Sequence, residues 1–248
     1  MTNEKIILNS LAETDKEIAT FWKEVDAAEK RLSAMLSKLL QEGDTVGSVD
    51  IAITKASVQQ ALVDSGYYKI VDRLLNDEYQ TLLDRNIKDY KAMIGDFAYN
   101  GTSIEKLNAM KDLDLSQFGQ LSDDLATQVT KHLINYQLGV ITQNQAVTFM
   151  GQAAGDLGKY SKTWIDTATS AFYRTSNAQL GLDNGIKNYE YFGPDDKITR
   201  PFCREHLGEV KSWEEWAKIT NGNQPGPVTV YGGGYGCRHV LTGIVDNA

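Results

Sequence analysis

Apolar side chains recur every three or four positions through the first forty residues of the chain, which is the period of one helix face. Between about Glu4 and Gln41 this pattern predicts a single long amphipathic helix. The stripe consists of Leu8, Leu11, Ile18, Trp22, Val25, Leu32, Leu36 and Leu39. Such a seam can pack within its own chain or on a neighbouring molecule, and packing within the chain is the more common arrangement.

The same periodicity continues to residue 183 and predicts several more helices. Breaks are expected at Gly43-Asp44 and Gly47-Ser48, at Asn100-Gly101, and between Gly151 and Gly158, because glycine and short polar residues favour helix ends. The capping boxes Thr102-x-x-Glu105 and Thr142-x-x-Gln145 mark two helix starts. The expected helices cover residues 4–41, 50–64, 68–97, 102–111, 121–138, 143–154 and 161–183.

Beyond Gly185 the pattern changes, and all four prolines of the chain follow residue 193. Strands are expected over residues 186–192, 207–210, 228–231 and 237–245, and Ser212-x-x-Glu215 is expected to cap a short helix. The predicted fold class is therefore mainly α, an extended helical N-terminal part with a small α+β C-terminal module. We expect three parts, a helical region 1–160, a connecting helix 161–185 and the C-terminal module 186–248.

Candidate chemistry is concentrated in this module, which holds both cysteines and two of the three histidines. They form two short clusters, Cys203-Arg204-Glu205-His206 and Cys237-Arg238-His239. Thiolate and imidazole are the ligands that zinc prefers, and a closed zinc site takes four of them. Cys203 and His206 could converge across a tight turn, while Cys237 and His239 would share one face of a strand. The favoured interpretation is a zinc (Zn) site with Cys203, His206, Cys237 and His239 as ligands, which would staple the module together.

Two other arrangements explain the same clustering. Cys203 and Cys237 could form a disulfide, or all four residues could pack in an ordinary hydrogen-bonded core. A disulfide is less favoured because two cysteines in a chain without a secretory signal rarely pair. The third histidine, His132, lies at helical spacing from Val129 and Tyr136, which favours a hydrogen-bonded, partly buried side chain over a metal ligand.

Composition restricts the partners that this chain can attract. The 248 residues include 25 Lys and Arg against 33 Asp and Glu, and the net charge of −8 argues against broad attraction to nucleic acid or to an anionic membrane. No apolar run approaches the ~20 residues of a membrane span. The start Met-Thr-Asn-Glu-Lys lacks the plan of a signal peptide, so we expect assembly in a cytoplasm and no membrane insertion.

Several short elements of the module occur in an order that resembles a known signature. They are Tyr191-Phe192-Gly193-Pro194-Asp195-Asp196, Thr199-Arg200-Pro201-Phe202-Cys203, Gly208, and Gly233-Gly234-Tyr235-Gly236-Cys237-Arg238-His239, preceded by Tyr173-Arg174-Thr175-Ser176-Asn177. Together they resemble the C-terminal part of phage minor head proteins of the Mu F-like head morphogenesis family, over about residues 170 to 245. His206 stands where some relatives have a second cysteine, and His239 where many have cysteine. Both exchanges preserve zinc-ligand chemistry.

The resemblance implies a structural minor capsid protein in the virion of a tailed bacteriophage. Such a protein lies inside the head near the portal, in several copies per particle, after assembly in the host cytoplasm. Its partners would be the phage portal protein and other head proteins, with possible contact to packaged DNA, and its role would be head morphogenesis, DNA packaging or genome ejection without catalysis. We expect the helical residues 1 to about 184 to form most of the contact with the portal ring.

Two alternatives from other functional classes remain. In a zinc-dependent nuclease, His206 or His239 would be the general base and Asp196 a metal or substrate group. That reading is disfavoured because a catalytic zinc keeps one position open, whereas four protein ligands close it. In a DNA-binding head protein a few arginines would touch the genome, and the acidic charge counts against it.

The remaining residues of the signature are expected to have structural roles. Asp195 and Asp196 should accept hydrogen bonds from turn amides and pair with Arg200 and Arg238. The short capped helix carries Trp213 and Trp216, which we expect to be core or interface anchors.

Overall fold

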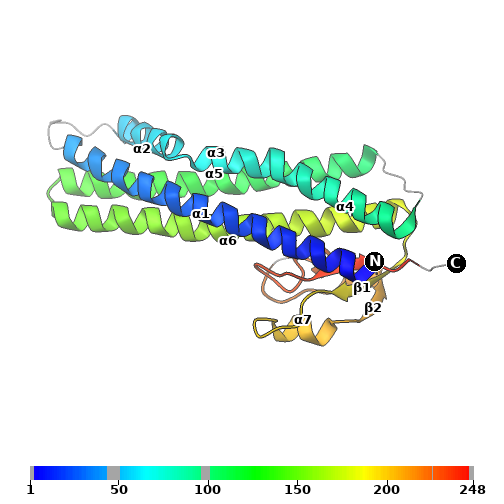
Figure 1. Ribbon diagram of the computed structural model, residues 1–248. Coiled ribbons are helices and arrows are strands. Elements are labelled where there is room, and N and C mark those ends of the chain that lie inside the picture. Colours follow the sequence, from blue (N-terminus) through cyan, green and yellow to red (C-terminus); the bar gives the residue numbers. More distant parts are fainter. Residues whose placement is uncertain (1–2, 44–50, 96–100, 225, 246–248) are drawn as a thin grey trace. The chain divides into compact units, whose positions relative to one another are not determined.

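The computed structural model describes residues 3–43, 51–95, 101–224 and 226–245, and it is mainly α with a small α+β C-terminal module, as predicted (Figure 1). The helices before the module are α1 Asn3–Gly43, α2 Ile51–Ser65, α3 Tyr67–Arg73, α4 Tyr79–Ile94, α5 Gly101–Gln137 and α6 Gln143–Asp183, and a π-helical turn, Leu74–Glu78, joins α3 to α4. The module contains β1 Asn188–Phe192, α7 Pro201–His206, β2 Val210–Ser212, α8 Trp213–Trp216, α9 Val228–Tyr231 and β3 Val240–Gly243. Among the described helices, none has a segment long and apolar enough to cross a bilayer.

The predictions for α1 and α2 are confirmed to within a few residues, and the helix predicted at 68–97 corresponds to α3, the π-helical turn and α4 together. The predictions after residue 100 divide the chain too often. The helices predicted at 102–111 and 121–138 are one helix, α5, and those at 143–154 and 161–183 are one helix, α6. The separate connecting helix at 161–185 is therefore wrong, because residues 161–183 are the last part of α6. The breaks predicted at Asp44–Ser48 and at Asn100 lie outside the described residues.

The glycines inside α6 explain this error. Gly151 has open space where a side chain would be, whereas a Cβ on Gly158 would lie 2.2 Å from Glu29 Oε2. A glycine inside a helix costs roughly 1 kcal/mol relative to alanine. Burial of neighbouring side chains such as Ala154 and Leu157 outweighs that cost, so α6 continues through Gly151, Gly155 and Gly158.

Contacts divide the chain into two compact units. The first contains Met1–Ala19, Leu74–Leu113 and Ile165–Ala248, and the second contains Thr20–Arg73 and Asp114–Trp164. The units alternate along the chain, so their limits do not coincide with the boundaries predicted at residues 160 and 185. The predicted C-terminal module belongs to the first unit together with parts of α1, α4, α5 and α6.

The second unit has a helical core. Its fully buried side chains include Val25, Leu32, Leu36, Val58 and Leu62. The ring of Phe118 packs edge-on against Tyr68, with centroids 5.7 Å apart, and tilted against Trp164 at 5.4 Å. Arg31 Nε donates a 2.7 Å hydrogen bond to the carbonyl of Ser65, where α2 ends.

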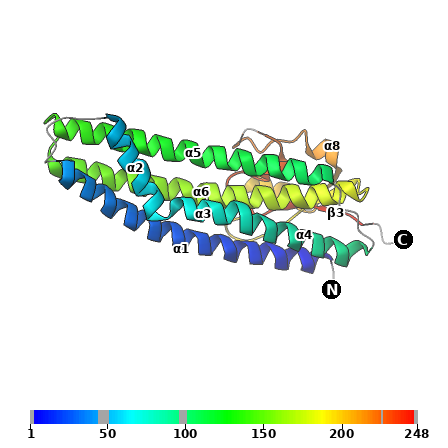
Figure 2. The same ribbon diagram turned by 90° about the horizontal axis from the view of Figure 1, so that it is seen from above.

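The helices of the first unit combine apolar packing with buried polar pairs. Tyr79 of α4 stacks on Phe172 of α6, with ring centroids 3.9 Å apart. Further along α4, Asn86 Nδ2 donates to Ser176 Oγ at 2.6 Å, and Ser10 Oγ of α1 donates to Asp89 Oδ2 at 2.5 Å. Figure 2 shows α4 beside the first part of α1. These contacts hold the end of α6 on which the C-terminal module is built.

The module is organised on a three-stranded antiparallel sheet in the order β2-β1-β3. Tyr189 and Tyr191 of β1 are completely buried, and Trp216 of α8 donates from Nε1 to the carbonyl of Tyr189 at 2.9 Å. Trp216 is therefore a core residue, as expected, and Trp213 packs partly buried against the same cluster. The expected capping box of α8 is present, with hydrogen bonds in both directions between Ser212 and Glu215.

The predicted strands are only partly correct. The predicted strand 186–192 corresponds to β1, β2 begins where the predicted 207–210 strand ends, and β3 is shorter than 237–245. The strand predicted at 228–231 is wrong, because these residues form α9. Pro227 precedes it in an extended conformation, and the amide of Gly232 closes the turn by donating to the carbonyl of Val228. Tertiary burial of Val228 outweighs the weak strand preference of a β-branched residue.

Candidate metal centre

Cys203 is positioned by the short helix α7. Arg200 is extended, and Pro201 then starts the helix with a φ angle that is already helical. Cys203 is the third residue of this helix, and it packs in the module core with 2% of its surface exposed. His206 is the last residue of α7, one turn further on.

Cys237 and His239 lie in the loop between the Gly-rich run and β3, not in the strand that was predicted for them. Gly232, Gly234 and Gly236 all have positive φ, a conformation that glycine adopts without steric cost. Gly233 has another role, because a Cβ there would lie 2.2 Å from Cys203 Sγ. The run therefore provides both the chain reversal and the room for two sulfur atoms.

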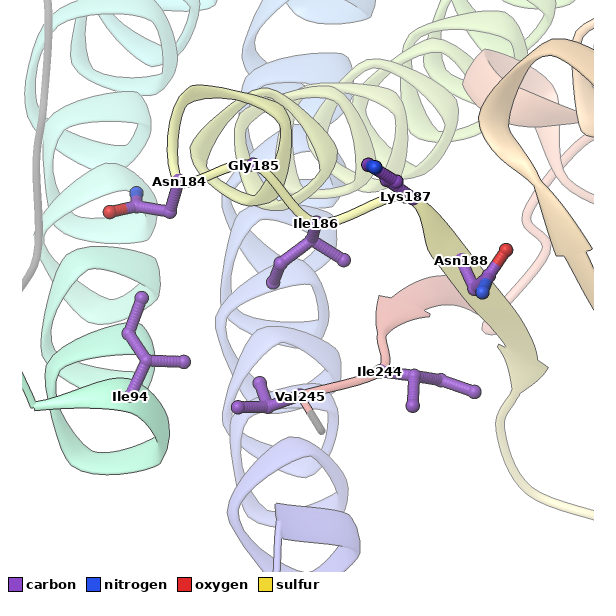
Figure 3. A pocket seen from close by; sticks show the side chains of 8 residues that line it. All are labelled: Ile94, Asn184, Gly185, Ile186, Lys187, Asn188, Ile244 and Val245. Carbon is purple, nitrogen blue, oxygen red and sulfur yellow. The ribbon is translucent and has the colours of Figure 1, made fainter. Parts of the chain in front are cut away.

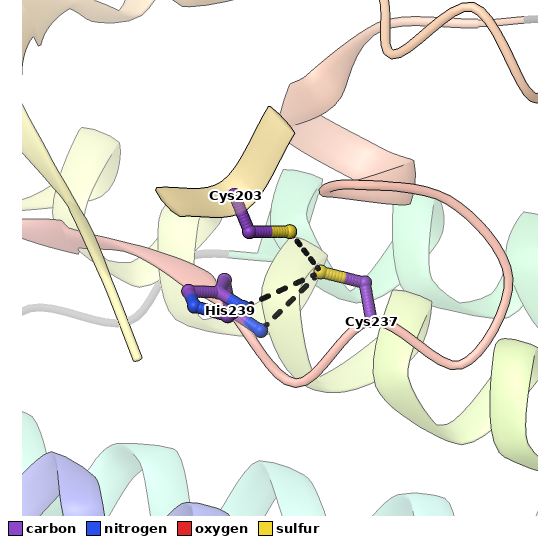
Figure 4. A group of neighbouring side chains, drawn as sticks. All are labelled: Cys203, Cys237 and His239. Carbon is purple, nitrogen blue, oxygen red and sulfur yellow. Dashed lines mark hydrogen bonds between the residues drawn. The ribbon is translucent and has the colours of Figure 1, made fainter. Parts of the chain in front are cut away.

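Three of the four predicted ligands come together. Cys203 Sγ lies 3.7 Å from Cys237 Sγ, and Cys237 Sγ lies 3.8 Å from His239 Nδ1 (Figure 4). One donor atom of each residue lies within 4.8 Å of the others, and all three side chains are 2–3% exposed. Both cysteines are free thiols, and their separation exceeds the ~2.05 Å of a disulfide bond. This buried cluster could hold a metal ion.

His206 does not join them, which corrects the prediction of a four-residue convergence. Its Nδ1 lies 2.8 Å from Glu209 Oε2, and its ring packs edge-on against Phe202, with centroids 4.5 Å apart. The turn after α7 explains this position. Gly208, with φ of 79°, turns the chain so that the Glu209 carboxylate meets the imidazole.

The tyrosine in the middle of the sheet completes the surroundings of the cluster. Tyr191 Oη lies 3.4 Å from Cys203 Sγ and 3.7 Å from Cys237 Sγ, and its ring stacks on His239 with an interplanar angle of 8°. Burial raises the pKa of this phenol. The Tyr191 side chain is thus the fourth polar group that faces the cluster.

Hydrogen bonds favour a thiolate at Cys237. Its Sγ accepts from the backbone amides of Gly233 at 3.1 Å and His239 at 3.4 Å. The hydrogen bond with Cys203 is the main cause that lowers the pKa of Cys237, and the same bond raises the pKa of Cys203. The hydrogen bond between the two sulfurs therefore favours ionisation of Cys237 over ionisation of Cys203.

One ring nitrogen of His239 stays without a partner among the described residues. Nδ1 faces Cys237, while Nε2 is buried and accepts or donates no hydrogen bond there. A neutral imidazole has one lone-pair nitrogen and one N–H, so a bound metal would use the first and leave the second.

A buried arginine of α6 holds the loop in place. Arg174 is 3% exposed, and it donates from Nε to the carbonyl of Val230 at 2.8 Å and from Nη1 to the carbonyl of Cys237 at 2.7 Å. Burial lowers the pKa of this guanidinium. Arg174 thereby fixes both sides of the Gly-rich run to the helix that precedes the module.

Asp195 and Asp196 form an acidic turn at the edge of the site, and one of them pairs with the arginine that was predicted. Arg238 Nη2 donates to Asp196 Oδ1 at 2.8 Å, and the same oxygen accepts from the amide of Ile198 at 3.1 Å. The hydrogen bond from Arg238 is the main cause that lowers the pKa of Asp196. The partner of Asp195 is Arg204, whose Nε lies 3.1 Å from its Oδ1.

Arg200 has a different partner from the one expected. Its guanidinium donates to the carbonyl of Gly233 at 3.2 Å and to the carbonyl of Tyr235. The side chain that precedes α7 therefore holds the Gly-rich run, which brings the run against Cys203.

Two further features, the third histidine and a surface pocket, do not involve the cysteines. His132 is partly buried, as expected, and stacks on Phe149 with centroids 4.4 Å apart, but its Nδ1 is buried without a hydrogen-bond partner among the described residues, which corrects that part of the prediction. A pocket of about 480 Å³ lies in the first unit (Figure 3). It is lined by Ile94, Asn184, Gly185, Ile186, Lys187, Asn188, Ile244 and Val245, and it includes none of the cysteines or histidines.

Comparison of the chain with protein-family models, with curated proteins and with solved structures found no match. The description of the site therefore rests on this chain alone.

Sequence reasoning missed two residues of the site, Tyr191 and Arg174. A signal for each was present. Tyr189 and Tyr191 alternate along a predicted strand and so share one face. Arg174 is a charged residue within the most apolar part of the predicted last helix, two positions after Phe172. What the sequence did not give was the distance of either side chain from the sulfur atoms.

Proposed function

We propose that this chain is a structural minor head protein of a tailed bacteriophage, bound at the portal vertex and acting in head assembly, DNA packaging or genome delivery. One observation carries the proposal. The short elements that resemble the Mu F-like signature are separated by about thirty residues, yet they contact one another around one site. Arg200 reaches the Gly-rich run, Arg238 reaches Asp196, and Cys203 meets Cys237.

We further propose that the metal is zinc. Zinc–sulfur bonds of about 2.3 Å and zinc–nitrogen bonds of about 2.0–2.1 Å give tetrahedral edges of about 3.8 Å between two sulfurs and about 3.5 Å between sulfur and nitrogen. The corresponding distances here are 3.7 Å and 3.8 Å. Two cysteines with a histidine also form a donor set that zinc favours over harder ions.

The proposed role of the zinc is structural. Cys203, Cys237 and His239 are 2–3% exposed, so a nucleic-acid phosphate would have no direct path to the ion. A structural zinc contributes directly to the free energy of folding. In this chain it would join α7 to the loop before β3, two segments more than thirty residues apart. This burial supports an assembly protein over the nuclease alternative.

The proposed partner is the portal protein, contacted mainly by the helical residues before the module. Support comes from large apolar side chains that remain exposed on the described helices and their turns. Leu113, Leu115, Leu138, Val140 and Tyr160 are each more than half exposed. Apolar side chains in contact with water favour burial against a partner.

The test combines location with composition. Purified particles should contain the protein, imaging should place it inside the head at the portal vertex, and element analysis of the isolated chain should find close to one zinc per chain. Cys203→Ser should lose the zinc and lower the melting temperature. A protein that is absent from particles and does not bind the isolated portal ring would contradict the head assignment. DNA cleavage that disappears in Asp196→Asn would support the nuclease instead.

A further inference from the structure

Three protein donors leave a tetrahedral metal site one ligand short. Within the described residues, the group of cysteine, histidine and carboxylate side chains close enough to share an ion consists of Cys203, Cys237 and His239. His206 is held by Glu209 instead. The fourth position therefore falls to another kind of oxygen or nitrogen atom.

The Tyr191 hydroxyl has the geometry of that fourth position. Zinc–sulfur bonds of about 2.3 Å and zinc–oxygen bonds of about 2.0–2.2 Å give a sulfur–oxygen edge of about 3.5 Å. Tyr191 Oη lies 3.4 Å from one sulfur and 3.7 Å from the other. The hydroxyl donates to Cys203 Sγ, and its oxygen can also accept from a Cys237 thiol, so it faces both sulfurs at once as a shared ligand position requires.

The side chain is also rigid. Tyr191 lies inside β1, where it is paired with Leu241 of β3, and none of its surface is exposed. Its ring stacks on His239 and packs tilted against Trp216, with centroids 5.6 Å apart. The hydroxyl is therefore held towards the two sulfurs by the packing of the ring against His239 and Trp216.

The surrounding charge fits an anionic site. Two thiolates, a neutral imidazole and a phenolate around Zn²⁺ sum to one negative charge. Arg174 is a buried cation whose charge is favoured by the anionic forms of Cys237, Tyr191, Asp166 and Cys203. A buried charge is costly unless it is compensated, and an anionic centre would compensate this one.

We infer that Tyr191 supplies the fourth ligand of the metal centre, through its phenolate oxygen, in the position that His206 was expected to take. The inference rests on the zinc site of the proposed function and deepens it. On zinc binding the Tyr191 O–H bond and the remaining cysteine S–H bonds break and their protons pass to solvent, while the oxygen and both sulfurs keep the electron pairs that they share with the ion. The centre is then closed by side chains of this chain alone.

The test adds zinc chloride to the full chain after treatment with a chelator, at neutral pH. A tyrosine hydroxyl has an ordinary pKa near 10, so a near-ultraviolet tyrosinate difference band appears on zinc addition only if the metal displaces a phenol proton. We expect the band in the unmodified chain, in His206→Gln and in Tyr235→Phe, whose ring is half exposed. We expect no band in Tyr191→Phe, and zinc affinity at least about tenfold weaker there.

The outcomes separate this inference from the zinc site itself. Zinc binding of equal affinity in Tyr191→Phe, with no tyrosinate band in the unmodified chain, would overturn the role of Tyr191 and keep the zinc. Failure of the unmodified chain to bind zinc would overturn both. If Tyr191→Phe does not fold, the band in the unmodified chain decides, because its absence is incompatible with a phenolate ligand.

Discussion

Space at a single glycine decides whether the two sulfurs can meet. Gly233 is not among the glycines with positive φ, so alanine fits its backbone, but the added Cβ would lie 2.2 Å from Cys203 Sγ. Cys203 has a short, buried side chain that cannot move away without losing Cys237. We predict that Gly233→Ala lowers the free energy of unfolding by about 1–3 kcal/mol and weakens zinc binding.

Gly151→Ala is the matched control for this change. Gly151 lies inside α6 with nothing within 4 Å of the added Cβ, so the substitution should raise the free energy of unfolding by about 0.5–1 kcal/mol. Urea unfolding and zinc titration of both variants measure the two effects. Equal stability of the two variants would contradict the crowding at Gly233.

A buried carboxyl of α4 should make the stability depend on pH. Asp89 is 8% exposed and accepts a hydrogen bond from Ser10, and burial raises its pKa above the ordinary value of about 3.9. Well below its ordinary pKa the carboxyl is neutral in both the folded and the unfolded chain. As pH rises through the interval up to the raised folded pKa, the unfolded chain releases this proton first, so folding loses stability.

Asp89→Asn removes this loss and keeps an oxygen that can accept from Ser10. We predict that the variant gains stability relative to the unmodified chain as pH rises from 4 to 7, as measured by urea unfolding at several pH values. Asp84→Asn, at an exposed position of the same helix, controls for the change in net charge. A difference between Asp89→Asn and the unmodified chain that stays constant over this range would rule out the explanation.

Residue type predicted which side chains are candidate metal ligands, but not which groups they contact. Cysteine and histidine spacing identified Cys203, Cys237 and His239, because few other roles need those residue types together. The spacing also selected His206, which is wrong as a member of the cluster. Whether an imidazole faces a metal or a carboxylate depends on where Glu209 returns after Gly208, and that is set by tertiary structure.

Among the elements, α8 shows how a local signal supports the core. Ser212 Oγ accepts from the amide of Glu215, the Glu215 carboxylate accepts from the amide of Ser212, and the helix carries the fully buried Trp216. We predict that Ser212→Ala lowers the free energy of unfolding by about 0.5–2 kcal/mol, because the Glu215 amide loses its acceptor and the Glu215 carboxylate loses the Ser212 hydroxyl. Chemical denaturation followed by tryptophan fluorescence measures the change.

Ser37→Ala provides the comparison for this prediction. Ser37 Oγ donates to the carbonyl of Ser33 within α1, a bond that slightly disfavours the helix, so its loss should be neutral or mildly stabilising. If both serine variants lose the same stability, the capping box is not the cause of the effect.

The helices show where a local sequence pattern is sufficient to predict an element and where it is not. The apolar stripe from Leu8 to Leu39 predicted α1, because its spacing is satisfied by one helix face alone. Gly151, Gly155 and Gly158 predicted a break that does not exist, because burial along α6 outweighs their local cost. The β-branched residues of Val228–Tyr231 predicted a strand, but the segment forms α9. Its conformation depends on the burial of Val228, which the local pattern does not reveal.

For the whole molecule, the helices are shared between two compact units, and this limits how the portal contact can be tested. Removal of residues 1–42 would delete Ile7 from the first unit together with Val25 and Leu32 from the second, all fully buried. Loss of portal binding after such a truncation would report unfolding and not an interface. A surface substitution is therefore required.

Leu138 and Val140 offer such a site, in the turn between α5 and α6. Their exposed fractions are 67% and 68%, and the turn is held by backbone bonds from Leu138 to Ile134 and from Val140 to Asn135. Neither side chain supports the core, so Leu138→Glu with Val140→Glu should leave the melting temperature unchanged. If the helical region forms most of the portal contact through this turn, each apolar side chain that is no longer buried there reduces the binding free energy by about 1.5–3 kcal/mol. The affinity for the portal ring should then fall more than tenfold.

Ile198→Glu is the matched control, because Ile198 is 66% exposed but belongs to the C-terminal module. Binding of each variant to the isolated portal ring, measured by sedimentation or surface plasmon resonance, separates the two regions. Loss of binding in the double variant alone places the contact on the helical region. Loss in Ile198→Glu alone would move it to the module, next to the metal centre, and would contradict the expected share of the helices.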